Sequence, residues 1–79
     1  MNALSTIRSS DPHWIAHLET QDDAMLRKLT ALGILPGNQI AIEQRFPSYI
    51  VSIGRTRAAL DRETVQCIFV TREQHPTAI

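Results

Sequence analysis

The pattern that most constrains the fold is a single amphipathic helix set among short segments of alternating polarity. At helical spacing, residues 23–32 place four apolar side chains within an arc of about 120°: Met25, Leu26, Leu29 and Leu32. Thr20 or Asp22 can cap the N-terminus of this helix, and Gly33 supplies the left-handed stop that helix C-termini favour. We therefore expect one helix face to be buried and the other to be solvated.

Five short strands are predicted around this helix. The first, residues 14–18, carries Trp14, Ala16 and Leu18 on one face. A Pro36-Gly37 turn follows the helix, and the remaining strands are residues 39–45, 49–53, 57–60 and 68–70, with a single helical turn at 61–64. This order predicts a mostly β protein, a small barrel with one inserted helix, because closure hides the strand edges of so short a chain.

Length and charge limit both the size and the partners of the protein. The 79 residues are enough for one domain, with an expected core at about 13–70 and a loose tail at 71–79. Eight basic and eight acidic residues give a formal net charge of zero, which argues against a nucleic-acid binder and against a polybasic membrane-surface protein. The longest strictly apolar run, residues 67–70, is far below the roughly 20 residues that cross a bilayer. We expect a soluble, cytoplasmic protein that does not insert into the membrane.

Three stretches of the chain resemble the FeoA family. Leu29-Thr-Ala-Leu-Gly-Ile-Leu-Pro-Gly37 is similar to the family pattern L-x-x-L-G-[ILM]-x-P-G, and residues 51–60 resemble its strand, tight turn and Ala-Leu strand. Glu63 followed by residues 68–70 fits the closing segment, so that the resemblance covers about residues 20–70. The shared positions serve mainly packing and backbone geometry, and they are Leu29, Leu32, Gly33, Pro36 and Gly37.

The resemblance implies an SH3-like barrel of about five strands with a helix inserted after the first. It also implies a bacterial cytosolic accessory protein of FeoB, the GTPase-linked ferrous-iron transporter of the inner membrane. The same fold forms the C-terminal domain of DtxR-type iron-dependent repressors, and this offers an alternative function in transcriptional regulation or nucleic-acid binding. Because nothing like a helix-turn-helix precedes the barrel, a free-standing FeoA-like protein is the better match.

Metal binding and catalysis find little support in the sequence. His13 and His17 would share a strand face about 13 Å apart, too far to meet at one ion, and we expect both to be exposed polar residues; His75 falls in the predicted tail. Cys67 stands alone, without a Cys or His at metal-ligand spacing. Asp61 and Glu63 lie in a turn, where capping is their expected role. The sequence predicts neither a metal nor a cofactor, and no enzyme activity.

Exposed apolar side chains remain as the candidates for a partner-binding site. Phe46 and Tyr49 flank Pro47 in a loop, where core packing demands least, and such a loop can dock a partner. Arg27 and Lys28, on the polar face of the helix, can add charge complementarity. The alternative is that the two rings cover the end of the barrel. We therefore predict an interaction module that binds FeoB, with these four residues as candidate contacts.

Overall fold

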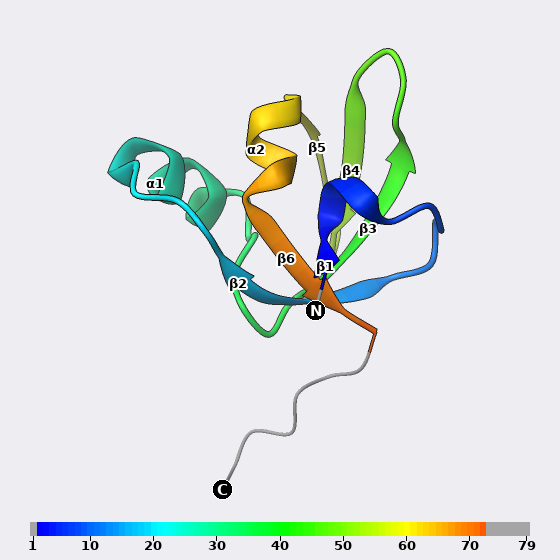
Figure 1. The fold of residues 1–79 in the computed structure, drawn as a ribbon, viewed down its shortest axis with the longest axis horizontal. Helices are drawn as coiled ribbons and strands as arrows, with labels where there is room; N and C mark the ends of the chain where they lie inside the picture. The colour runs from blue at the N-terminus through cyan, green and yellow to red at the C-terminus, as the bar shows by residue number, and fades with distance from the viewer. Residues whose placement is uncertain (1, 73–79) are drawn as a thin grey trace, which may run out of the picture.

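The computed structural model of the chain describes residues 2–72 (Figure 1). The elements follow one another along the chain in this order: β1 (Asn2–Ala3), the 3₁₀ helix η1 (Leu4–Thr6), β2 (His13–Leu18), α1 (Asp23–Ala31), β3 (Gln39–Gln44), β4 (Tyr49–Ile53), β5 (Thr56–Leu60), α2 (Arg62–Gln66) and β6 (Ile68–Thr71). The five predicted strands and the inserted helix are all present. The predicted turn at 61–64 is longer than expected and forms α2.

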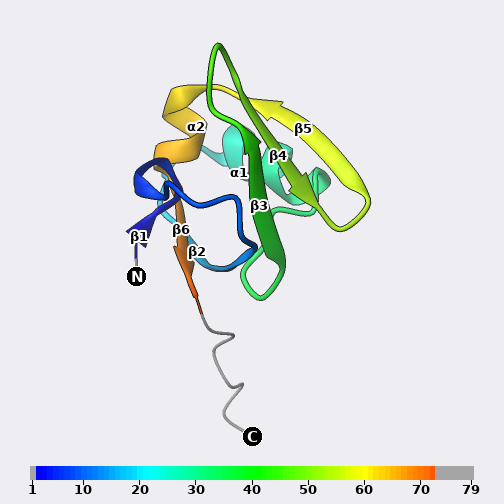
Figure 2. The ribbon, with the colours of Figure 1, turned by 90° about the vertical axis from the view of Figure 1, so that its right-hand side faces the viewer.

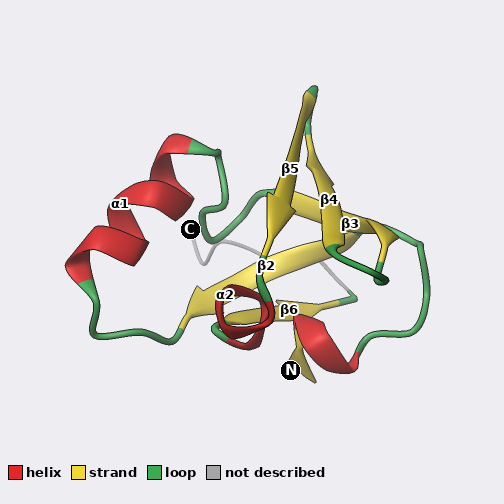
Figure 3. Cartoon of the chain, turned by 90° about the horizontal axis from the view of Figure 1, so that it is seen from above, coloured by secondary structure: helices red, strands yellow, loops and turns green. Residues whose placement is uncertain are grey.

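The strands form one antiparallel sheet in the order β1-β6-β2-β3-β4-β5. The sheet bends strongly, so that β4 and β5 stand across β2 and β6 (Figures 2 and 3). β4 and β5 form a regular hairpin from Tyr49 opposite Leu60 to Ile53 opposite Thr56. The mostly β, barrel-like fold class predicted from the sequence is confirmed, with β1 as a sixth strand.

The helix α1 begins and ends where the sequence predicts. The carboxylate of Asp22 accepts hydrogen bonds from the backbone N–H groups of Ala24 at 2.9 Å and Met25 at 3.3 Å, which makes it the N-cap. Gly33, just past the last turn, has a φ of 86°, and its N–H donates to the carbonyl of Thr30. The glycine therefore ends the helix in a conformation that a side chain would disfavour.

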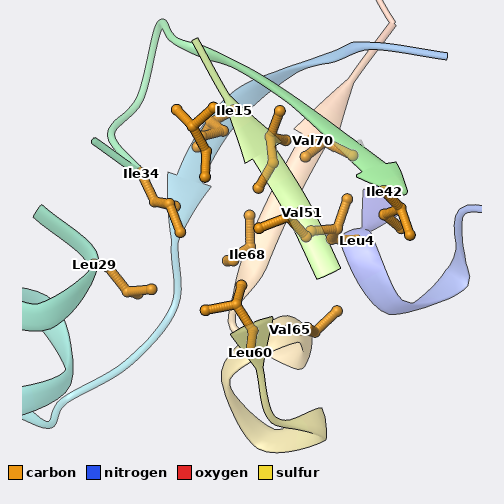
Figure 4. Close-up of a cluster of buried hydrophobic side chains, with 12 residues drawn as sticks. Leu4, Ile15, Leu29, Ile34, Ile42, Val51, Leu60, Val65, Ile68 and Val70 are labelled. Atoms are coloured by element: carbon orange, nitrogen blue, oxygen red, sulfur yellow. The ribbon is translucent and has the colours of Figure 1, made fainter. Parts of the chain in front are cut away.

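The core lies between the two halves of the bent sheet and under α1 (Figure 4). Its buried apolar side chains come from nearly every element: Leu4, Ile15, Leu29, Ile34, Ile40, Ile42, Val51, Ile53, Leu60, Val65, Ile68 and Val70. Leu29 has no exposed surface, whereas Leu32 is partly buried against the cluster. Of the predicted apolar face of α1, Leu29 thus contributes most to the core.

The N-terminal segment is part of this core, although the sequence analysis placed the core from about residue 13. Leu4 is only 1% exposed, and β1 pairs with β6 through Asn2 opposite Val70 and Ala3 opposite Phe69. At the other end, Thr71 belongs to β6 and pairs with Trp14. The rest of the predicted tail, residues 73–79, lies outside the described residues.

β2 differs from the predicted regular alternation. The register of its pairing with β6 shifts between Ile15 and His17, as at a β-bulge, where one strand gains an extra residue. Ile15 is buried and Leu18 also packs against the core. In a regular strand, two residues three positions apart would point to opposite faces. His13, expected to be exposed, is only 5% exposed. The prediction for His13 was therefore wrong.

Candidate partner-binding surfaces

An open groove of about 400 Å³ lies where the end of α1, the start of β2 and the β4–β5 turn meet. The half-buried side chains of Trp14 and Leu32 give it apolar walls, and Thr56 lies at its rim. All three glycines of the chain line this groove, and each has a positive φ. We call it the glycine groove. The sequence analysis missed it, although its glycines and only tryptophan were visible there.

Backbone geometry, more than crowding, requires glycine here. A Cβ at Gly33 would lie 3.6 Å from Cγ2 of Ile53, an ordinary contact, but the φ of 86° is one that side chains rarely adopt. At Gly37 and Gly54 an added Cβ would meet nothing within 4 Å. A side chain at either position would therefore stand free in the groove.

Hydrogen bonds hold the walls of the glycine groove together. The N–H of Gly37 donates to the carbonyl of Ile15, and the N–H of Ile15 donates to the carbonyl of Asn38, each at 2.8 Å. The side-chain amide of Asn38 donates to the carbonyl of Gly33, also at 2.8 Å. The turn after α1 is thus tied to β2, and these bonds fix the walls of the groove.

The β3–β4 turn separates the two aromatic side chains predicted to dock a partner. Phe46, at the tip, is 87% exposed, while Tyr49 is half-buried and packs against the core. The amide of Gln44 donates to the carbonyl of Ser48 at 3.2 Å across the turn. Tyr49 therefore packs on the core, in the direction of the alternative interpretation, and Phe46 is by far the more exposed of the two rings.

Arg45 braces this turn against the N-terminal segment. Its Nε and Nη2 donate to the carbonyl of Ile7 at 3.1 and 2.8 Å, and Nη2 also donates to the carbonyl of Ser9 at 3.0 Å. Arginine suits this role because its planar fork can engage two carbonyls at once. Phe46 follows directly, so the exposed ring is attached to a fixed base.

Arg27 and Lys28 are exposed on α1, as predicted. The charge of Lys28 reaches Asp61 at the start of α2, where it contributes to lowering the pKa of that carboxyl. Figures 1 and 3 place α1 and the β3–β4 turn on different sides of the molecule. The four predicted contact residues therefore do not form one patch.

The glycine groove and the Phe46 tip lie at opposite ends of β4. The strand runs from Tyr49, next to the tip, to Ile53, next to Gly54, and these two residues are about 13 Å apart at 3.3 Å per residue. A partner that fills the groove therefore approaches a different end of the hairpin from one that contacts the tip. The structure offers two separate surfaces, one concave and one projecting.

The residues weighed for metal binding and catalysis have structural partners. Nε2 of His17 lies 2.9 Å from a carboxylate oxygen of Glu19, and its ring stacks on Phe69 with centroids 4.8 Å apart. The thiol of Cys67 donates to the carbonyl of Glu63 at 3.3 Å. Across residues 2–72, no three His, Cys, Asp or Glu side chains are grouped as a metal site would require. His75 is outside the described residues.

Asp61 caps α2. Its carboxylate accepts from the hydroxyl of Thr64 at 2.6 Å and from the backbone N–H of Thr64 at 2.8 Å. These two hydrogen bonds, with a smaller contribution from Lys28, lower the pKa of Asp61 against a small opposing effect of burial. The ionised carboxylate therefore stabilises the helix start, in the capping role expected for it.

The bent antiparallel sheet with a helix inserted after β2 defines a small SH3-like barrel, and solved structures share this fold. Iron(II) transport protein A from Clostridium thermocellum is 27% identical, with a TM-score of 0.78 over 89% of this chain and 44% of that one. Stenotrophomonas maltophilia FeoA complexed with zinc, described as a procaryotic SH3 domain protein, is 23% identical, with a TM-score of 0.73 over 85% and 86%. A manganese-dependent transcriptional repressor is 23% identical, with a TM-score of 0.80 over 91% and 41%.

The FeoA domain model matches residues 3–72, and the chain therefore belongs to the FeoA domain family. The match includes the N-terminal segment that contributes Leu4 to the core. A comparison with curated proteins finds no match.

Proposed function

We propose that this protein is a cytoplasmic accessory protein of ferrous-iron transport that binds the FeoB-type GTPase-transporter and has no catalytic activity of its own. Family membership over residues 3–72 is the observation that carries this proposal. The relative from Stenotrophomonas maltophilia is described as possibly acting as a ferrous iron transport activating factor, which supports a regulatory role. Within residues 2–72, no helix has the length and apolar character that crossing a membrane requires.

Phe46 is the contact residue that the geometry supports best. Its ring is 87% exposed on a turn that Arg45 fixes to the N-terminal segment. A loop backbone that is already held in place loses little conformational freedom when a partner binds, and aromatic side chains dominate the binding energy of many interfaces. The partner would therefore bury Phe46 in an apolar pocket of its own.

Co-purification with the cognate transporter tests the proposal. The tagged full-length protein is mixed with membranes that contain FeoB, and the amount of transporter retained is measured. We expect retention by the wild type and about a tenfold weaker association for Phe46→Ala, which corresponds to roughly 1.4 kcal/mol. If the wild type retains no transporter in membranes or as an isolated cytosolic domain, the proposed function is wrong.

Thr56→Lys is the matched control for the other surface. Thr56 is exposed at the rim of the glycine groove, so a lysine there obstructs the groove and leaves the core intact. We expect this variant to bind normally. If Thr56→Lys abolishes association and Phe46→Ala does not, the contact lies in the groove and not at the tip. If both variants bind fully, Arg27 and Lys28 become the residues to test.

A role in transcriptional regulation is the second candidate, and the 0.80 TM-score to the manganese-dependent repressor favours it. That likeness, at 23% identity, extends over 41% of the repressor chain, and with a net charge of zero this protein has no overall electrostatic attraction for DNA. A gel-shift at low salt distinguishes the two functions, because a nucleic-acid module shifts DNA there and a FeoB-binding module does not.

A further inference from the structure

A second pocket, on a different side of the sheet from the glycine groove, has the chemistry of an anion site. It measures about 360 Å³ and lies between the N-terminal segment and the end of β6. Arg8, His13 and Arg72 line it, together with Ser9, and no acidic side chain of residues 2–72 does so. Because the chain has as many acidic as basic residues, this excess of positive charge is a local property of the pocket and does not reflect the charge of the whole protein. We call it the His13 pocket.

Of the two ring nitrogens of His13, only Nδ1 is hydrogen-bonded within the described residues. The side chain is only 5% exposed, and Nδ1 lies 2.9 Å from the carbonyl oxygen of Asp11. Because a carbonyl only accepts, Nδ1 carries the proton and donates it. Nε2 has no hydrogen-bond partner within residues 2–72. Every fully buried side-chain nitrogen or oxygen in these residues has a partner, so Nε2 is not fully buried. Nε2 is therefore reachable from the pocket that His13 lines.

The wall of the pocket around Ser9 is already fixed. The carbonyls of Ile7 and Ser9 accept hydrogen bonds from the guanidinium of Arg45, and the hydroxyl oxygen of Ser9 accepts from the N–H of Asp11 at 2.9 Å. That bond leaves the hydroxyl hydrogen of Ser9 available to a ligand. The pocket thus combines two permanent cations, a free hydroxyl donor and an imidazole nitrogen on a braced segment.

We propose that the His13 pocket binds a phosphate group. Arginine is charged at every physiological pH, and its fork matches the geometry of phosphate oxygens. A neutral Nε2 can accept from the P–OH of free phosphate, and a protonated Nε2 can donate to the P–O⁻ of either free phosphate or a phospholipid head group. The group belongs either to free phosphate or to a phospholipid head group at the membrane surface.

Amide NMR on the full-length chain tests the pocket with inorganic phosphate at constant ionic strength. We expect saturable shifts confined to the segment around Thr6 to His13 and to Thr71 and Arg72. The double variant R8Q/R72Q should bind about a hundredfold more weakly, because each of the two lost charge-assisted hydrogen bonds is worth roughly a factor of ten. Shifts that never saturate, or that spread over the whole surface, overturn the proposal.

Two further variants separate binding from folding. His13→Asn keeps a donor near the position of Nδ1 for the carbonyl of Asp11 and removes Nε2, so we expect a native spectrum with weakened phosphate binding. Arg55→Gln removes an exposed arginine that does not line the pocket, so binding should be unchanged. If Arg55→Gln weakens binding as much as R8Q/R72Q does, phosphate binds by general charge attraction and the site is refuted.

Vesicle sedimentation distinguishes the two sources of the phosphate group. Vesicles that contain phosphatidylglycerol are compared with vesicles of phosphatidylcholine alone. Binding to the anionic vesicles that R8Q/R72Q abolishes supports a lipid head group as the ligand. Saturable binding of inorganic phosphate without any vesicle association supports a free phosphate. Absence of saturable phosphate binding refutes the site, whatever the vesicles show.

Discussion

Truncation of Leu29 tests how the inserted helix stabilises the barrel. Leu29 has no exposed surface and lies in the core cluster with Ile34, whose N–H also donates to the carbonyl of Leu29 at 2.9 Å. A fully buried Leu→Ala change costs about 2–5 kcal/mol, the loss of transfer free energy plus the cavity. Since the backbone of Leu29 is fixed both within α1 and, through the N–H of Ile34, to the following turn, we expect little collapse into the cavity and a cost in the upper half of this range.

That cost approaches the whole stability of a domain of this size, about 3–5 kcal/mol. We therefore expect Leu29→Ala to be largely unfolded at 37 °C. Leu32 is only partly buried, so we expect Leu32→Ala to lower the free energy of unfolding by about half as much as Leu29→Ala does. Leu35, 38% exposed and outside the core cluster, provides the control, with a change of about 0.5 kcal/mol.

Urea denaturation followed by circular dichroism measures all three variants. The account predicts the order Leu29, Leu32, Leu35 from the largest to the smallest loss of free energy of unfolding. A Leu29→Ala protein as stable as the wild type would refute the reasoning, because it would mean that α1 does not pack as the structure shows.

Three further predictions follow from single residues. Phe46→Ala should change the free energy of unfolding by about 0.5 kcal/mol, and Tyr49→Ala by about 2 kcal/mol, since only the latter ring packs on the core; equal thermal shifts would contradict this assignment. Gly33→Ala should cost about 1–2 kcal/mol through its φ of 86°, whereas a variant with unchanged melting temperature would show that the turn relaxes freely. The lowered pKa of Asp61 means that its stabilising effect is complete above the ordinary aspartate value of about 3.9 and is lost as pH falls through the lower value in the folded state. The difference in unfolding midpoint between wild type and Asp61→Asn should therefore be constant near neutral pH and should shrink in acid; a pH-independent difference would contradict it.

Local signals made α1 and five of the strands predictable. The cap at Asp22, the apolar arc that contains Leu29 and the stop at Gly33 all act within a few residues, and the structure uses each of them. The hairpin of β4 and β5 follows in the same way from alternation on both sides of the turn at Gly54. Such features need no knowledge of distant parts of the chain.

The features that the sequence did not reveal depend on distant partners. Leu4 is buried because β1 pairs with β6, which lies at the other end of the chain: Ala3 is opposite Phe69 and Asn2 is opposite Val70. A strand of two residues is too short to show an alternating pattern in the sequence. His13 is buried because the chain before it folds back and because β2 carries a bulge. Neither contact leaves a periodic signal.

The candidate site was predictable only in part. Phe46 was identified because it lies in a loop, where core packing demands least, and the structure exposes it. The separation of Phe46 from Arg27 and Lys28, and the glycine groove itself, depend on how the sheet bends. Sequence patterns do not encode that curvature directly.

Titration of the purified full-length protein against the cytosolic domain of the FeoB-type transporter tests the central claim most directly. Isothermal titration calorimetry gives the affinity, and Leu35→Ala serves as the apolar surface control beside Phe46→Ala. The account predicts saturable binding by the wild type and by Leu35→Ala, and about tenfold weaker binding by a fully folded Phe46→Ala. Absence of saturable binding by the folded wild-type protein, with and without guanine nucleotide, would contradict it.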